Sequence, residues 1–162
     1  MRGMYLRIPL FANYRTPAAA VLWCCLACVS LPAEQQLDLP ALIGMDLQQV
    51  YQRLGVPAEV YTLRGERPEQ DDVVFYYPSH LYLFWFQNRV WQARVDRRFS
   101  GTVFSVSMGA TRRQVSDSME HPVSQLADSL LIHMEDRGYP LQARLYFEED
   151  RLVDVYCFRG DL

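Results

Sequence analysis

The feature that most constrains the fold of this chain is a short sequence pattern that occurs twice. The first copy runs from Gly44 to Pro57, and a weaker second copy runs from Gly109 to Pro122. The two glycines are 65 positions apart, and so are the two prolines. A constant offset of this kind is typical of a tandem repeat. We therefore expect the chain to contain two copies of one structural unit after its N-terminal segment.

The first copy predicts a short helix that is capped at both ends. Asp46 can accept hydrogen bonds from free N–H groups of the first turn, and its charge suits the positive end of the helix dipole. Gly55 can adopt the left-handed conformation that ends a helix, and Pro57 prevents its continuation. Apolar side chains recur between them at the spacing of one helix face: Leu47, Val50, Tyr51 and Leu54.

The second copy predicts a weaker helix. Thr111 is the capping residue, and the apolar face is reduced to Val115 and Met119. Arg112 and Arg113 occupy the first turn, where the helix dipole disfavours positive charge. We therefore expect the second helix to be the less stable of the two.

Apolar and polar residues alternate after each helix, which is the period of a β-strand. Short gaps separate several of these segments, as expected for antiparallel hairpins. We therefore predict an α+β fold of two tandem repeats, each a short helix followed by a three- or four-stranded antiparallel meander. The sheets would form one continuous or paired surface with the helices on one face. The expected strands are residues 59–63, 72–77, 80–86 and 89–96 in the first repeat, and residues 123–127, 130–135, 141–147 and 152–158 in the second.

The N-terminal segment predicts export from the cytoplasm. Residues 1–16 carry three arginines and no acid, and residues 17–31 form an uncharged apolar run. A bilayer-spanning helix needs about 20 apolar residues, so this run favours a cleaved signal peptide over a transmembrane anchor. The predicted organisation is a signal peptide over residues 1–28, a polar tether over residues 29–40, and two repeats over residues 41–98 and 99–162.

Residues 25–28, Cys-Leu-Ala-Cys, resemble the lipobox of bacterial lipoproteins. The resemblance implies cleavage before Cys28 and acylation of its thiol and amino groups. The alternative is ordinary signal cleavage between Ala27 and Ala33. A redox Cys-x-x-Cys motif is disfavoured because both cysteines lie inside the apolar run. With the signal removed and Cys28 acylated, Cys157 is the one remaining thiol, and we expect it to be buried as a small apolar residue.

Charge and motif content narrow the functional classes. The chain contains no lysine, which excludes P-loop and Schiff-base chemistry. From Glu34 onward, 13 arginines face 19 acidic residues, so the body is acidic and gives no electrostatic sign of nucleic-acid binding. His80, His121 and His133 stand apart from one another and from other metal ligands. We therefore predict a protein that is not an enzyme and that binds no metal, cofactor or nucleic acid.

Alternation in the C-terminal strands predicts which side chains face the core. Val155 and Cys157 alternate with the charged Asp154, and Leu145 alternates with Arg144. Because successive side chains on a strand point to opposite faces, the apolar set should point inward. The expected inward residues are Trp91, Ala93 and Val95 in the first repeat, and Leu141, Ala143, Leu145, Phe147, Val153, Val155 and Cys157 in the second.

Alignment of the last hairpin of each repeat extends this pattern to the first repeat. Residues 84–91 match residues 145–153 if the second turn is one residue longer. Leu81, Leu83 and Trp85 then point outward, where a contiguous apolar patch is typical of a binding site. In the alternative, another segment of the chain covers these three residues. The inward residues in this alignment are Tyr82, Phe84 and Phe86. The other predicted partner-binding residues on the outer face are Arg94, Arg144, Tyr146 and Tyr156.

The twice-occurring pattern and the strands after it resemble a known family. Residues 44–57 read G-M-x-x-x-x-V-x-x-x-L-G-x-P, which is similar to the SmpA/OmlA family of small, BamE-like outer-membrane lipoproteins. Two copies resemble the tandem-repeat fold of β-lactamase inhibitor proteins. The second copy has Glu120 in place of the helix-ending glycine. The structural residues of the motif are Gly44, Asp46, Gly55 and Pro57 in the first copy, and Gly109, Thr111 and Pro122 in the second.

The resemblance implies a scaffold or protein-binding function. In these families, single-copy members scaffold membrane-protein assembly, and two-copy members bind a protein on a concave sheet. We therefore predict a non-enzymatic envelope lipoprotein that is anchored to the outer membrane, faces the periplasm, and binds another protein through an exposed sheet face. It would touch the membrane only through its lipid anchor. The alternatives are a secreted or surface inhibitor of an envelope or host hydrolase, and a small-ligand carrier with a pocket near Tyr76, Phe84 and Trp91.

Overall fold

The computed structural model describes residues 36–65 and 71–162 of the chain. All of these residues belong to one compact unit. The predicted signal peptide and Cys28 therefore lie outside the described residues. None of the helices in the described ranges is long and apolar enough to cross a membrane.

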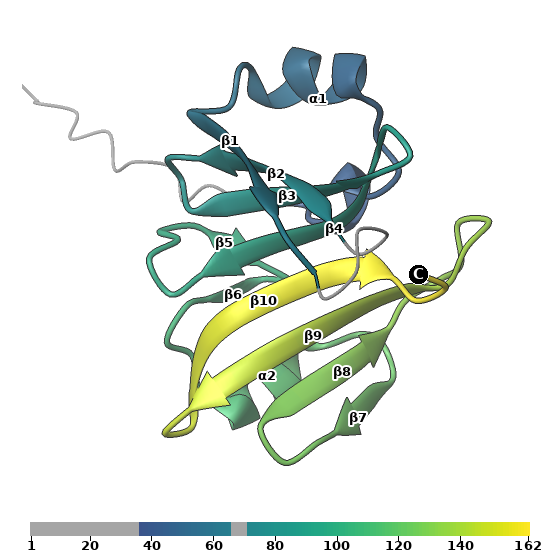
Figure 1. Cartoon of the computed structure of the whole chain (residues 1–162). Coiled ribbons are helices and arrows are strands. Elements are labelled where there is room, and N and C mark those ends of the chain that lie inside the picture. The colour runs from purple at the N-terminus through teal and green to yellow at the C-terminus, as the bar shows by residue number, and fades with distance from the viewer. Residues whose placement is uncertain (1–35, 66–70) are drawn as a thin grey trace, which may run out of the picture. The chain divides into compact units, whose positions relative to one another are not determined.

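Eight strands form one antiparallel sheet in the order β1-β2-β3-β4-β10-β9-β8-β7 (Figure 1). Two further strands, β5 and β6, pair with each other outside this sheet, and Thr102 of β5 also forms a bridge with Gln36. The elements in chain order are η1 (Pro40–Leu42), α1 (Leu47–Leu54), β1 (Glu59–Leu63), β2 (Asp72–Tyr77), β3 (Leu81–Phe86), β4 (Arg89–Asp96), β5 (Thr102–Val103), β6 (Val106–Ser107), α2 (Arg112–Ser118), β7 (Val123–Gln125), β8 (Ser129–His133), β9 (Leu141–Glu148) and β10 (Arg151–Arg159).

The predicted α+β fold of two tandem helix-plus-meander repeats is wrong. The described chain is mostly β, with one continuous sheet and only two short α-helices. The sheet is continuous because β4 pairs with β10, from Gln92 opposite Phe158 to Asp96 opposite Asp154. This pairing joins residues about 60 positions apart along the chain, and the local patterns used for the prediction carry no information about it.

The twice-occurring pattern instead marks a docking contact that is made at two places on this one sheet. The N–H group of Gly44 donates to the carbonyl of Val90 at 2.8 Å, and the N–H group of Gly109 donates to the carbonyl of Leu152 at 2.8 Å. The φ angles of these glycines are +86° and +82°, a conformation that is strained for residues with a side chain. Each glycine therefore lies where the chain bonds to a strand of the sheet just before the helix that follows.

The predicted helix caps are confirmed. The carboxylate of Asp46 accepts a bond from the N–H group of Gln49 at 2.9 Å, and the hydroxyl of Thr111 accepts one from the N–H group of Gln114 at 3.3 Å. In each case the glutamine side chain accepts a bond back from the capping residue, which completes a capping box. Gly55 ends α1 with a φ angle of +76°, as predicted.

The core lies on one face of the sheet, between the sheet and the two helices. Val50 of α1 and Val115 of α2 are both fully buried in it. In Figure 1, α2 lies behind β8 and β9. Leu39 is also fully buried, and the N–H group of Leu37 donates to the carbonyl of Thr102 at 2.8 Å. Residues 36–40 of the predicted tether are thus packed against the folded body.

Side-chain orientation is confirmed for β9 and for most of β4 and β10. The prediction is wrong for Trp91 and Val153, because Val90 and Leu152 take the core positions at the start of these two strands. Trp91 and Val153 line hollows on the opposite face, and the strand pairing is irregular beside each of them. The other predicted inward residues of these strands are at most 9% exposed. Cys157 is among them and is fully buried, as expected for a small apolar residue. Burial raises the pKa of its thiol far above the ordinary value, so the thiol stays protonated and is a poor nucleophile.

The predicted orientation of β3 is wrong. Leu81 is 2% exposed, and Leu83 is fully buried opposite Ala93 in the core. Tyr82 points to the other face, where it lies opposite Arg94. The inward set Tyr82, Phe84 and Phe86 therefore belongs to the face away from the helices.

The cause of this error is the length of one turn. Strand β9 extends through Glu148, so the turn after it consists of Glu149 and Asp150, with φ angles of 49° and 63°. Gln87 and Asn88 form the equivalent turn after β3, with φ angles of 48° and 61°. The two turns are equally long. Counting one extra residue in the second turn shifts the alignment by one position, which moves every side chain of the strand to the opposite face.

Candidate functional site

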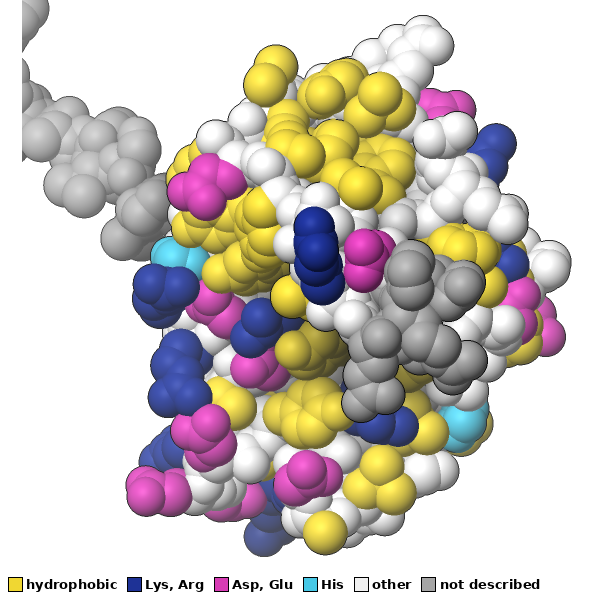
Figure 2. Space-filling model, in the orientation of Figure 1, with side chains coloured by type: hydrophobic (Ala, Val, Ile, Leu, Met, Phe, Trp, Pro, Cys, Tyr) yellow, Lys and Arg dark blue, Asp and Glu magenta, His cyan; other side chains and the backbone are white. Residues whose placement is uncertain are grey.

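The face of the sheet opposite the helices carries a row of aromatic and arginine side chains. Cross-strand pairing places one such residue on each of β2, β3, β4, β10 and β9. Figure 2 shows this face, with hydrophobic side chains and arginines exposed beside one another. We call these residues the central row: Tyr76, Tyr82, Arg94, Tyr156 and Arg144.

Four of the seven predicted partner-binding residues lie on this open face, namely Arg94, Arg144, Tyr146 and Tyr156. The other three do not. Of the two alternatives for Leu81 and Leu83, the structure supports burial within the chain. Trp85 is half-buried on the helix side, where its ring lies 4.8 Å from that of Phe75 and lines a groove of about 540 Å³ beside α1.

Arg94 holds the centre of the row in place. Its guanidinium carbon lies 5.2 Å from the ring centre of Tyr82 and 5.3 Å from that of Tyr156. Its Nε donates to Asp154 Oδ1 at 2.8 Å. Burial lowers the Arg94 pKa, but the bond to Asp154 and the nearby tyrosines outweigh burial and raise the pKa. Arg94 therefore stays charged, and its charge is balanced within the fold, so it acts as a rigid support for the two rings.

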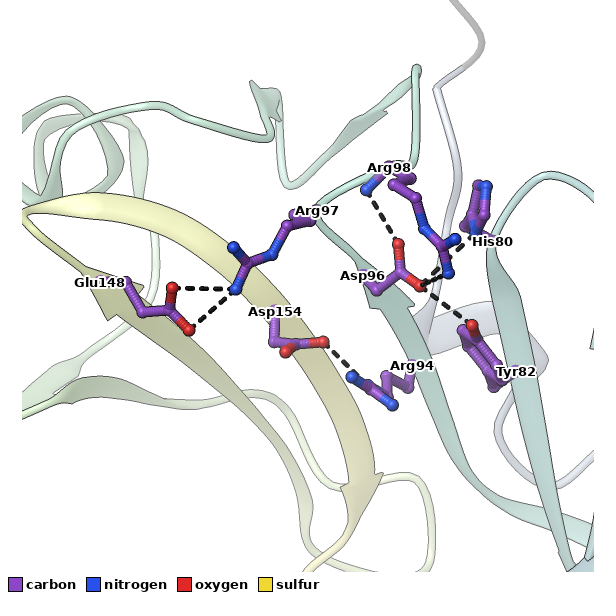
Figure 3. A network of polar contacts seen from close by, with 8 residues as sticks. All are labelled: His80, Tyr82, Arg94, Asp96, Arg97, Arg98, Glu148 and Asp154. Carbon is purple, nitrogen blue, oxygen red and sulfur yellow. Dashed lines mark hydrogen bonds and ion pairs between the residues drawn. The ribbon is translucent and has the colours of Figure 1, made fainter.

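Asp96 anchors one end of β4 through a set of bonds that Figure 3 shows. The Tyr82 hydroxyl donates to Asp96 Oδ2 at 2.9 Å, and the Arg98 N–H group donates to Oδ1 at 2.8 Å. His80 Nδ1 lies 3.5 Å from Oδ2. Burial raises the Asp96 pKa, but the bonds from Arg98 and Tyr82 outweigh burial and lower the pKa below its ordinary value.

Asp96→Asn should therefore lower the free energy of unfolding at neutral pH. It should also make that free energy fall less steeply as the pH decreases. A carboxylate with a lowered folded-state pKa stabilises the fold above its unfolded pKa of about 3.9, and this contribution is lost as pH falls through the folded-state pKa. We expect Asp96→Asn to lose about 1–2 kcal/mol at pH 7 and less at pH 3. Urea unfolding at both pH values measures this. The control Asp117→Asn, on the exposed surface of α2, should change stability by less than about 0.5 kcal/mol. An equal loss at both pH values would contradict this role of Asp96.

Arg144, at the end of the central row, differs from Arg94 because it has no acidic partner among the described residues. Its Nε is buried and makes no hydrogen bond, and its Nη1 makes only a long one, 3.4 Å, to the Tyr146 hydroxyl. The ring of Tyr146 lies 5.6 Å from that of Tyr156. Arg144 therefore presents an uncompensated positive charge beside two aromatic rings.

A surface hollow of about 410 Å³ adjoins Arg144. Its walls are mainly aromatic and come from β4, β9 and β10, together with the C-terminal segment. The lining residues are Trp91, Gln92, Arg144, Tyr146, Tyr156, Phe158 and Leu162. The arrangement suits a group that combines an apolar body with a negative charge.

The described residues contain no group of three or more His, Cys, Asp or Glu side chains that could hold a metal ion. His80 lies beside Asp96, His133 lies beside Gln142 with 3.4 Å between the side-chain nitrogens, and His121 is exposed. His80 and His133 therefore make separate local contacts.

Comparison with known proteins gives little further information. No family model matches the chain, and no curated protein matches it. A similar solved structure is that of an extracellular protein containing an SCP domain from Bacillus anthracis str. Ames, with a TM-score of 0.49 and 14% sequence identity. The match covers 82% of this chain and 48% of that chain, so this chain spans about half the length of that protein. A likeness this weak carries no argument about function, and the resemblance to the SmpA/OmlA and β-lactamase inhibitor families stays a prediction.

Proposed function

We propose that this protein is an exported, non-enzymatic envelope protein that binds another protein through the open face of its sheet. The observation that carries the proposal is the central row. Tyrosine and arginine are the residue types most enriched, with tryptophan, in the energetic centres of protein interfaces. Here they are held in fixed positions by ring contacts and by the ion pair between Arg94 and Asp154.

The shape of the surface favours a protein over a small ligand. The central row crosses five strands, which at about 4.8 Å between neighbours gives a length of about 19 Å. A small-ligand carrier would need open space beside Phe84 and Trp91. Phe84 is only 7% exposed, and its ring lies 6.5 Å from that of Trp91, so side chains occupy the space between these two rings. The open space that Trp91 lines is the surface hollow beside Arg144.

The proposed location rests on the N-terminal segment. Its arginines, its short apolar run and its lipobox-like residues support export and acylation of Cys28. We propose that the lipid anchors the protein to the outer membrane with its body in the periplasm. The alternative function, inhibition of an envelope or host hydrolase, would use the same sheet face. An inhibitor is distinguished from a scaffold protein by an activity assay, in which the purified protein would inhibit the hydrolase that it captures.

The test is a comparison of partner capture by matched variants. Tagged wild-type protein and Tyr156→Ser are isolated from the native envelope, and bound proteins are compared by quantitative mass spectrometry. Loss of an interface centre costs about 2 kcal/mol, or about 30-fold in affinity, so at least one captured protein should be strongly depleted. Gln48→Ser on the exposed surface of α1 should capture it as the wild type does. Equal capture of every protein by Tyr156→Ser would contradict the proposal, provided that circular dichroism shows the variant to be folded.

A further inference from the structure

We infer that Arg144 and the hollow beside it form a receptor for one side-chain carboxylate of the partner, from an aspartate or glutamate that follows an aromatic or apolar residue. This inference rests on the proposed function and deepens it. It specifies what the open face recognises at one end of the central row.

The charge at Arg144 requires a counter-ion that the described fold does not supply. The other arginines of this face have acidic neighbours: Arg94 bonds to Asp154 at 2.8 Å, and Arg97 bonds to both carboxylate oxygens of Glu148 at 2.8 and 2.9 Å (Figure 3). Arg144 sits on the same sheet with a buried Nε that makes no bond. A buried, unbonded polar atom is unfavourable, so a ligand that neutralises this guanidinium gains more than it would at an exposed arginine.

The surroundings select a single carboxylate over a phosphate. One unpaired arginine neutralises one negative charge. The second negative charge of a phosphate dianion would be repelled by the acidic body, which has 19 acidic residues against 13 arginines from Glu34 onward. Asp154 also lies opposite Tyr146, next to the site. A carboxylate is planar and fits the fork of a guanidinium with two parallel bonds.

The hollow selects an apolar residue beside that carboxylate. Trp91, Tyr156 and Phe158 line it together with Arg144. Aromatic walls lower the local polarity, which strengthens an ion pair made at their edge. Burial raises the pKa of Tyr156, so its hydroxyl stays protonated and can donate a hydrogen bond to a ligand at neutral pH.

The test uses two capped dipeptides that differ in one group. N-acetyl-Phe-Asp-amide carries the carboxylate, and N-acetyl-Phe-Asn-amide is its neutral match. Each is titrated into the full-length protein while the Trp91 indole N–H signal is followed by NMR. We expect the Asp peptide to bind at least about tenfold more tightly than the Asn peptide, with an affinity that falls as salt rises. Arg144→Gln should remove the difference, and Arg113→Gln, the same charge change on α2 at a side chain that is 91% exposed, should keep it.

Two results would overturn the inference: equal binding of the two peptides to the wild type, or an unchanged preference in Arg144→Gln. The peptide result is separable from the proposed function. If the Asp peptide is preferred but Tyr156→Ser captures every partner normally, the receptor stands and the proposed function falls. If Tyr156→Ser loses a partner but the peptides bind equally, the proposed function stands and the receptor falls.

Discussion

Leu83→Ser should unfold the protein or lower its free energy of unfolding by about 4 kcal/mol. The reason is that Leu83 is fully buried opposite Ala93 in the core. Truncating a buried leucine leaves a cavity and costs about 2–5 kcal/mol, and the new hydroxyl adds the cost of burying a polar group. Urea unfolding followed by circular dichroism gives the difference directly.

The matched control for Leu83→Ser is Val60→Ser on β1. Val60 is 56% exposed, so its replacement should cost about 1 kcal/mol or less. If Leu83→Ser unfolded at the same urea concentration as the wild type, Leu83 would lie on the surface. The assignment of the helix side as the core face of β3, and with it the position of the open face, would then be incorrect.

Gly44→Ala should lower the free energy of unfolding by about 3 kcal/mol. Its φ angle of +86° is strained for alanine, which alone costs about 1–2 kcal/mol. A methyl group at Gly44 would also stand 2.6 Å from the Tyr139 hydroxyl oxygen, which now donates to the carbonyl of Ile43 at 3.0 Å. Tyr139 would have to move and give up that bond, which adds about 1 kcal/mol.

Gly109→Ala separates the two causes. Gly109 has nearly the same φ angle, +82°, but a methyl group there meets no atom within 4 Å. Its replacement should cost only the backbone strain, about 1–2 kcal/mol. Thermal or urea unfolding of both variants measures the difference. Equal losses would show that the Tyr139 contact does not contribute to the docking of α1.

Local features of the fold could be predicted from the sequence, and non-local ones could not. The capping residues Asp46 and Thr111 act on groups three positions away, so the sequence pattern contains the whole interaction. The apolar face predicted for α1 corresponds less well to the residues that are buried. Val50 is fully buried, but Leu47 and Tyr51 are 43% and 41% exposed, because a helix of eight residues presents little of its surface to the sheet. The pairing of β4 with β10, which makes the sheet continuous, has no local signature.

The candidate site could be predicted in part. Arg144, Tyr146 and Tyr156 alternate with buried residues in their own strands, so their outward direction follows from local sequence. Tyr82 was missed because the direction of β3 was transferred from another hairpin. Tyr76 lies on β2, for which no side-chain direction is predicted from the sequence. An alignment with a two-residue turn at Glu149-Asp150, of the same length as Gln87-Asn88, places the side chains of β3 on the correct faces. A small error in a turn thus changes which side chains are available to a partner.

The most direct test of the open face as the binding surface is site-specific photo-crosslinking in the native envelope. The photoreactive residue p-benzoylphenylalanine replaces Tyr82 or Tyr146 on the open face, and Gln48 on α1 or Arg113 on α2 as controls on the helix side. The predicted result is a discrete crosslinked protein from both open-face positions and none from the two controls. A crosslink from Gln48 or Arg113, with none from Tyr82 or Tyr146, would place the partner on the helix side and contradict this account.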